Sequence, residues 1–167
     1  MVLFPPGPGG GQEVEHGYKG KGSLLHLVVD KEGRPLWITT TSAKGNEREQ
    51  ALTLLDHLNI IRGKNSKQMT ICEADKGYDA AHLRQSMLNK GYLPLIGCRK
   101  NNKQRVGTSE IANFFGVTRK RWVVERSFSW LKRKCRRLLM RWERKSEIWD
   151  AFAKLGLIYM WVEVLLG

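Results

Sequence analysis

The chain has 167 residues, of which 41% are hydrophobic and six are Trp, a composition that suits one folded domain and argues against a disordered tail. Its 29 Lys and Arg outnumber its 16 Asp and Glu, and the net charge of +13 favours a phosphate-rich partner over a merely basic soluble protein. Three scattered cysteines argue against a disulfide framework or a zinc site, and no secretory signal or membrane-spanning stretch is visible, so we expect an intracellular protein.

The predicted elements alternate between strands and helices. Residues 1–23 are rich in Gly, Pro and Lys and are expected to form a loop. From there the pattern predicts, in chain order, a hairpin of strands 24–29 and 35–41, a helix 47–58 capped by Asn46, a strand 68–73, a helix 79–90, a strand 93–98, a basic loop 99–120, and helices 121–138 and 146–165. This order predicts an α/β domain with a mixed sheet.

Two carboxylates lie in contrasting surroundings. Asp75 follows the predicted strand 68–73, at the strand end where α/β sheets place their ligands, whereas Glu125 lies in the most basic part of the chain. Brought together in space, two such groups could coordinate Mg²⁺ and support phosphodiester exchange. The alternative for Asp75 is a turn or capping role, for which Asp79 is better placed; the alternative for Glu125 is a salt bridge with Arg121.

A basic surface follows Glu125 on the same predicted helix. Arg121, Glu125 and Lys132 share one face, because residues 4 and 11 apart on a helix lie within roughly 40° of each other. The cations Lys132, Arg133, Lys134, Arg136 and Arg137, continued by Arg141, Arg144 and Lys145, predict a sequence-tolerant contact with the DNA backbone or, alternatively, a solvated helix face. The aromatic residues Trp142, Trp149, Phe152 and Trp161 are expected in the core.

Several of these segments together resemble one family. The sequence Ala74-Asp75-Lys76-Gly77-Tyr78-Asp79, with Leu83-Arg84, Lys90-Gly91 and Pro94, resembles the region around the second catalytic Asp of DDE transposases from bacterial insertion sequences of the group four and five superfamily. Arg121, Glu125 and Lys132 match the spacing of that family's Y-x2-R-x3-E-x6-K pattern, with Thr118 in place of the Tyr. Residues 26–30 and 33–36 are similar to the family's hairpin, and the resemblance covers about residues 17–165.

The resemblance implies a ribonuclease-H-like catalytic domain over residues 23–167, preceded by a flexible segment over 1–22. It implies that Asp75 and Glu125 hold Mg²⁺ or Mn²⁺, and that Arg121 and Lys132 position phosphates and the attacking hydroxyl end. The expected activity is metal-dependent cleavage and transfer of double-stranded DNA at element ends and target. The alternatives are a non-catalytic DNA-binding or interaction remnant and a metal-dependent nuclease of the same fold.

One expected carboxylate has no counterpart. The family's first catalytic Asp precedes the hairpin, but nothing acidic precedes Glu13, and Asp30 is assigned to the hairpin turn. We therefore expect an N-terminally truncated product that is weakly active or inactive alone. It is expected in the cytoplasm with the nucleoid, away from membranes, as a homo-oligomer or in association with an upstream-frame product.

Overall fold

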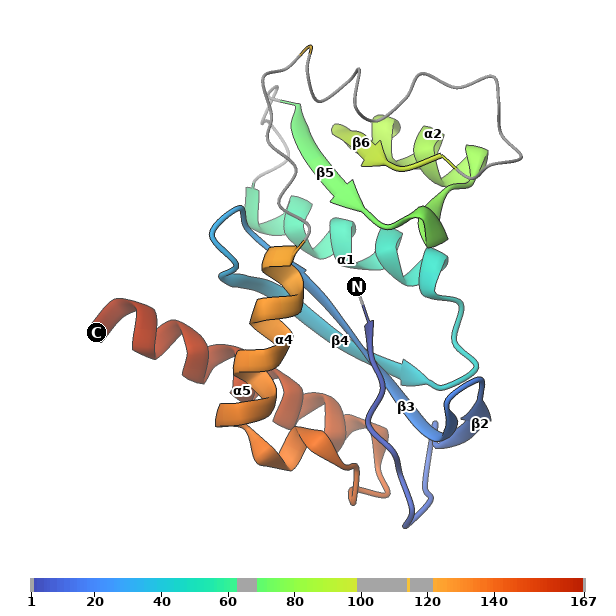
Figure 1. The fold of residues 1–167 in the computed structure, drawn as a ribbon, viewed down its shortest axis with the longest axis vertical. Coiled ribbons are helices and arrows are strands. Elements are labelled where there is room, and N and C mark those ends of the chain that lie inside the picture. The colour runs from blue at the N-terminus through green and yellow to red at the C-terminus, as the bar shows by residue number, and fades with distance from the viewer. Residues whose placement is uncertain (1, 63–68, 99–113, 115–121, 167) are drawn as a thin grey trace. The chain divides into compact units, whose positions relative to one another are not determined.

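The computed structural model describes residues 2–62, 69–98, 114 and 122–166 (Figure 1). The chain forms two compact units, one of residues 1–50 with 122–167 and one of residues 51–121. Strands and helices occur in both, so the fold is mixed α/β. No helix in the described part of the chain is long and apolar enough to cross a membrane.

The first unit is built on an antiparallel sheet around one long strand. Strand β3 (Gly20–Val29) pairs with β4 (Pro35–Ser42), so that Leu25 lies opposite Thr40. It also pairs with two short strands, β1 (Val2–Leu3) and β2 (Glu15–Gly17). These two strands lie in the segment that the sequence predicted to be loop. They escape pattern analysis because neither is long enough to show a period.

The predicted hairpin turn between β3 and β4 is confirmed. The Asp30 carboxylate accepts the backbone N–H groups of Glu32 at 2.9 Å and Arg34 at 2.8 Å. Gly33 has φ of +90°, a conformation that side chains disfavour. Asp30 therefore shapes the turn, as the sequence indicated.

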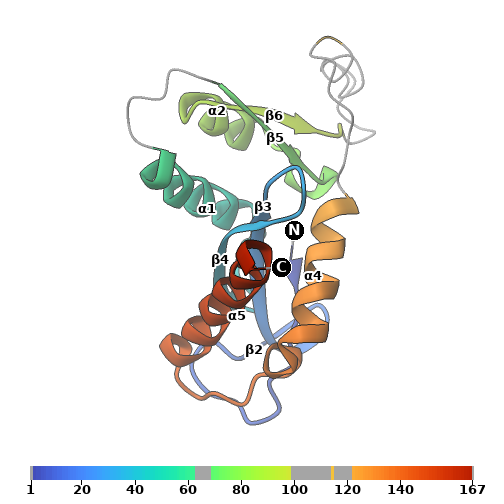
Figure 2. The same cartoon turned by 90° about the vertical axis from the view of Figure 1, so that its left-hand side faces the viewer.

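Three helical segments complete the first unit: α4 (Trp122–Lys134), the 3₁₀ turn η2 (Arg136–Leu139) and α5 (Ser146–Leu166). Helix α4 packs against β3 and α5 against β4 (Figure 2). The helix predicted over 121–138 is too long, because the backbone leaves the helical conformation at Cys135. The break lets Leu138 turn into the core beside Gly156 of α5.

The core of this unit lies between the sheet and the helices. Its buried residues are Leu25, Leu27, Ile38, Phe128, Leu131, Leu138, Trp149, Ala153 and Met160. The core position predicted for Trp149 is confirmed, and Phe152 packs against the core partly buried. The core position predicted for Trp142 is wrong, since that residue is 55% exposed. A single aromatic residue outside a helix gives no period from which its facing side could be read.

Helix α5 also closes the free edge of β4. The backbone N–H and the Oγ1 hydroxyl of Thr40 donate to one oxygen of Asp150, at 3.2 and 3.3 Å. The Trp161 ring nitrogen donates to the Pro35 carbonyl at 2.6 Å. Side chains from α5 thus satisfy edge groups that would otherwise invite another strand.

One buried histidine belongs to the sheet itself. His26 on β3 is 1% exposed, and its Nε2 lies 2.7 Å from the Thr41 hydroxyl of β4. Burial lowers the pKa of His26 to about 4, so the ring is neutral near pH 7.

The second unit contains a strand–helix–strand arrangement. Strand β5 (Thr70–Ala74) is followed by the 3₁₀ turn η1 (Lys76–Tyr78), helix α2 (Ala81–Asn89) and strand β6 (Tyr92–Ile96). The two strands are parallel, with Ala74 opposite Ile96. The sequence predicted one mixed sheet, whereas the described strands pair as two sheets of uniform direction.

Helix α1 (Glu47–Arg62) begins in the first unit and continues into the second. The predicted cap is confirmed, because the Asn46 side chain accepts the Arg48 N–H at 3.1 Å. Within the second unit the Tyr92 hydroxyl donates to Asn59 of α1 at 2.9 Å. This bond ties the start of β6 to the helix. The predicted basic loop 99–120 lies almost entirely outside the described residues.

Candidate functional site

Asp75 lies directly after β5, at the carboxyl end of the parallel strand pair. Its Oδ1 accepts the Lys76 N–H at 2.7 Å, and its carbonyl accepts the Tyr78 N–H at 2.9 Å. Asp75 therefore caps η1, while its side chain stays exposed. Strand β5 itself is half-buried.

Asp79 does not cap α2, the role for which the sequence favoured it. Its side chain is fully buried and pairs with Arg84, whose Nη2 and Nε both lie 3.1 Å from Oδ1. The same Nη2 donates to the Ile96 carbonyl at 2.6 Å. Arg84 thus joins the segment after β5 to the carboxyl end of β6. We call this arrangement of Asp79, Arg84 and Ile96 the strand-end lock.

The strand-end lock was missed by the sequence analysis. Both charged residues stand in the segments that carried the family resemblance, but five positions separate them and the first lies outside the helix. They therefore lack the i,i+4 spacing within one helix that predicts an ion pair. The lock restrains the same sheet edge at which Asp75 lies.

Two further residues define that edge. A Cβ on Gly97 would lie 2.9 Å from Cγ of Lys76, so the lysine stem packs over this glycine. On β5, burial raises the pKa of the Cys72 thiol to about 11. The thiol stays protonated near pH 7, and a protonated thiol is a poor metal ligand or nucleophile.

Glu125 lies in the first turn of α4, in the other unit, with an exposed side chain. Its carbonyl accepts the Ser129 hydroxyl at 3.0 Å. Among ion pairs formed between described residues, none uses the Glu125 carboxylate. Arg121 lies outside the described residues, and so does the predicted Arg121–Glu125 salt bridge.

The residue after Glu125 has a structural role that the sequence did not reveal. Arg126 lies between the rings of Trp122 and Trp130, 4.8 Å from each centroid. Its Nη2 donates to the Glu32 carbonyl in the hairpin turn at 2.5 Å. Arg126 thus stacks on aromatic faces and holds α4 against the turn.

A second contact to the hairpin turn lies one residue further along. The Ser127 hydroxyl is buried and donates to the Gly33 carbonyl at 2.6 Å. A Cβ on Gly33 would lie 2.7 Å from Val123 and 3.1 Å from the Ser127 hydroxyl. Glycine is therefore needed for α4 to approach the turn this closely. These contacts fix the backbone on which Glu125 is carried.

The predicted DNA-binding cations fall into two sets. Lys132 and Arg133 at the end of α4 and Arg136 on η2 are exposed, and no ion pair between described residues involves them. Lys134 instead pairs with Glu163 of α5. Arg137 pairs with Glu143 at 2.6 Å and lies over the Phe152 ring. The exposed, unpaired set is therefore the better candidate for phosphate contact.

Arg141 does not belong to the basic surface, although the sequence placed it there. It is fully buried, donates to the carbonyls of Glu143 at 3.0 Å and Gln12 at 2.5 Å, and lies over Trp149. Burial lowers the pKa of its guanidinium from the ordinary value. The side chain anchors the N-terminal segment to the turn before α5.

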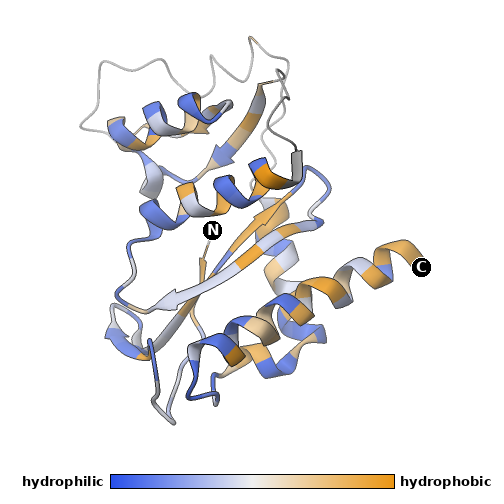
Figure 3. Ribbon diagram, turned by 180° about the vertical axis from the view of Figure 1, so that it is seen from behind, coloured by the Kyte–Doolittle hydropathy of each residue, from blue (hydrophilic) through white to orange (hydrophobic). Residues whose placement is uncertain are grey.

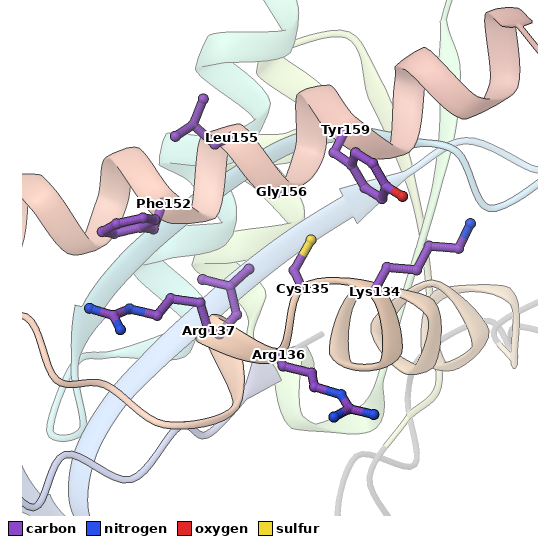
Figure 4. Close-up of a pocket in the computed structure, with 9 residues that line it drawn as sticks. Lys134, Cys135, Arg136, Arg137, Phe152, Leu155, Gly156 and Tyr159 are labelled. Carbon is purple, nitrogen blue, oxygen red and sulfur yellow. The ribbon is translucent and has the colours of Figure 1, made fainter.

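A groove of about 310 Å³ separates η2 from α5 (Figure 4). Lys134, Arg136 and Arg137 line one side, and Phe152, Leu155 and Tyr159 of α5 line the other. Burial raises the pKa of the Cys135 thiol in its wall. The groove is basic on one side and apolar on the other.

The donor atoms of Asp75 and Glu125 can be compared with the ligands that a divalent cation prefers. Hard cations such as Mg²⁺ take oxygen ligands, and Asp75 and Glu125 each offer an exposed carboxylate. Within the described ranges no three His, Cys, Asp or Glu side chains form a group that could hold a metal ion. The donor chemistry fits a divalent cation, and the site itself stays a prediction.

Comparison with known proteins gives two findings. Residues 5–161 match the family described as Transposase DDE domain. Over 138 residues the chain is 36% identical to a Burkholderia cepacia protein described as "Putative transposase for insertion sequence element IS402". That alignment covers 81% of this chain and 60% of the relative. The chain thus spans about 60% of that relative's length.

Proposed function

Because this chain belongs to the Transposase DDE domain family, we propose that it carries catalytic residues of a DNA transposase that cleaves and transfers strands. We also propose that its strands and helices belong to a ribonuclease-H-like fold. Its partners would be the double-stranded DNA of element ends and target, met in the cytoplasm and at the nucleoid.

The observation that carries the proposal is the position of Asp75. It follows a parallel strand, at the sheet edge where α/β folds bind ligands, and the strand-end lock restrains that edge. An exposed carboxylate on a rigid base suits a cation that must stay fixed during reaction. Glu125 is likewise exposed on a helix held in place by Arg126 and Ser127.

In the proposed mechanism Asp75 and Glu125 hold a divalent cation through their carboxylate oxygens. Such a cation, when bound, activates the attacking oxygen and stabilises the leaving oxygen in phosphodiester exchange. Lys132 lies two helical turns after Glu125, which places the two on the same face of α4, about 10 Å apart along the axis. Its ammonium group would neutralise a backbone phosphate beside the reacting one.

The test measures metal binding without DNA. Titration calorimetry with Mg²⁺ and with Mn²⁺ compares the unaltered chain with Asp75→Asn and Glu125→Gln. Both substitutions keep shape but remove charge, and Asn preserves an acceptor that can cap η1. We expect each to weaken the same site at least tenfold. Asp56→Asn and Glu49→Gln, which alter exposed carboxylates on α1, are the matched controls and should leave binding unchanged.

Two outcomes would contradict the proposal. The first is that the unaltered chain binds neither ion, and the second is that the Asp75 and Glu125 variants bind as the controls do. If DNA binding survived either outcome, the chain would be a non-catalytic DNA-binding remnant.

A further inference from the structure

Helix α5 carries an apolar stripe along its exposed side. The residues Ile148, Ala151, Leu155, Ile158, Val162 and Leu165 are all exposed, and we call them the α5 seam. Their separations alternate between three and four residues over 18 positions. Leu155 is 58% exposed, Ile158 55% and Leu165 75%. No seam position carries a charged or polar side chain.

The seam is separate from the side of α5 that packs inside its own unit. Trp149, Ala153, Gly156 and Met160 are buried there and form the inner side of the helix. The C-terminal half of α5 is coloured mostly hydrophobic in Figure 3. Since the inner side is already occupied, the seam is a second apolar face, and the described residues leave it open to solvent.

The seam has a spacing that a second helix can match. Apolar residues at alternating separations of three and four follow a 3.5-residue repeat, which two packed helices share. A membrane-surface helix needs a polar face opposite its apolar one, but the face opposite the α5 seam is buried in the core.

We propose that the α5 seam binds the α5 seam of a second copy of this chain, forming a two-fold dimer. The same surface then serves both partners, as a two-fold interface requires. In a parallel pair Ala151 would face its own copy, and in an antiparallel pair it would face Val162. The pattern is self-complementary in both orientations, because the separations of the seam residues read the same from either end.

The area available is sufficient for such a dimer. Five of the seam side chains, flanked by the exposed Tyr159 and Leu166, keep between 43% and 83% of their surface exposed. Burying that surface on two copies removes on the order of 1,000 Å² from water, near the lower bound for a specific interface. The seam positions themselves are uncharged, and Lys154 beside the seam is paired with Asp150 at 2.6 Å.

The first test is sedimentation of the whole chain between about 1 and 100 μM, without metal or DNA. We expect a concentration-dependent dimer. Ile158→Glu puts two carboxylates into the seam and should weaken dimerisation at least 100-fold. Val164→Glu is the matched control, because Val164 is 45% exposed on the same helix but lies off the seam. A chain that stays monomeric at 100 μM, or equal effects of the two substitutions, would overturn the proposal.

A second variant keeps the proposal testable if Ile158→Glu fails to fold. Ala151→Cys combined with Val162→Cys should form an intermolecular disulfide on oxidation in either helix orientation. The unaltered chain, with its three native cysteines, and the Val164→Cys variant are controls that should not cross-link through α5. Absence of the cross-link in a folded double variant contradicts the dimer. Neither test depends on the metal-binding result, so this inference can fail while the proposed function stands.

Discussion

Asp75 and Asp79 lie four residues apart, but their surroundings give them different roles. The first is exposed at a strand end and accepts one backbone N–H from Lys76. The second is buried, accepts the Nε–H of Arg84 and forms an ion pair with its Nη2. Removing one partner of a buried ion pair is destabilising, whereas an exposed carboxylate can meet a ligand. Asp79 therefore has a structural role, and Asp75 is the candidate metal ligand.

Asp79→Asn should destabilise the chain by about 3 kcal/mol or more, because it leaves the largely buried Arg84 without its counter-charge. Urea unfolding followed by circular dichroism measures the change. Asp56→Asn is the matched control, because the Asp56–Lys90 ion pair is exposed and should contribute less than about 1 kcal/mol. Similar losses for both variants would show that the strand-end lock contributes little.

At the scale of elements, contact between α4 and the β3–β4 turn organises the first unit. Arg126 and Ser127 donate to two successive carbonyls of the turn. Arg126 follows Glu125 directly, and Ser127 lies two residues after it. The turn therefore positions the backbone of a candidate metal ligand. The expected consequence is that a change in the turn alters α4 as well.

Gly33→Ala should destabilise the first unit by about 2–4 kcal/mol, because the new Cβ would contact Val123 at 2.7 Å in a backbone conformation that alanine disfavours. Thermal unfolding measures the loss. Gly77→Ala is the control, since a Cβ there meets no atom within 4 Å and its φ is not positive. An unchanged melting temperature for Gly33→Ala would mean that α4 does not depend on the close approach.

At the scale of the whole molecule, the positive charge is unevenly distributed along the chain. Residues 1–50 contain six basic and six acidic side chains, whereas residues 132–137 contain five basic and no acidic ones. The structure subdivides this basic segment further by pairing Lys134 and Arg137 with acidic partners. The five basic residues of this segment therefore overstate the cations available to a phosphate backbone, since two of them are paired.

Replacing Lys132, Arg133 and Arg136 together by Gln should lower the salt dependence of DNA binding. If all three contact phosphates, the slope of log K against log salt falls by about 2–3, since each contact contributes about 0.9. Fluorescence anisotropy with duplex DNA from 50 to 200 mM salt measures it. A triple Gln variant of the exposed Lys19, Lys31 and Lys44 removes equal charge elsewhere. Equal slopes for the two triple variants would argue against a localised DNA surface.

The sequence by itself determined the elements that local forces decide. Two runs rich in strand-forming residues around a Gly-containing turn predicted the β3–β4 hairpin. Helical periodicity with capping residues predicted α1 and α5. It also identified the family and placed Asp75 after a strand. These features depend on residues close together in the chain. The short strands β1 and β2 were missed because they are defined by their pairing with β3, and no local sequence pattern indicates them.

Only the tertiary structure decided what the charged residues do. The sequence treated Arg137 and Arg141 as parts of one basic surface, but folding pairs the first with Glu143 and buries the second. Folding also stacks Arg126 between two Trp rings. It also ended α4 at Lys134 and left the α5 seam exposed. Charge and periodicity are properties of a sequence, whereas burial and pairing depend on segments brought together from distant parts of the chain.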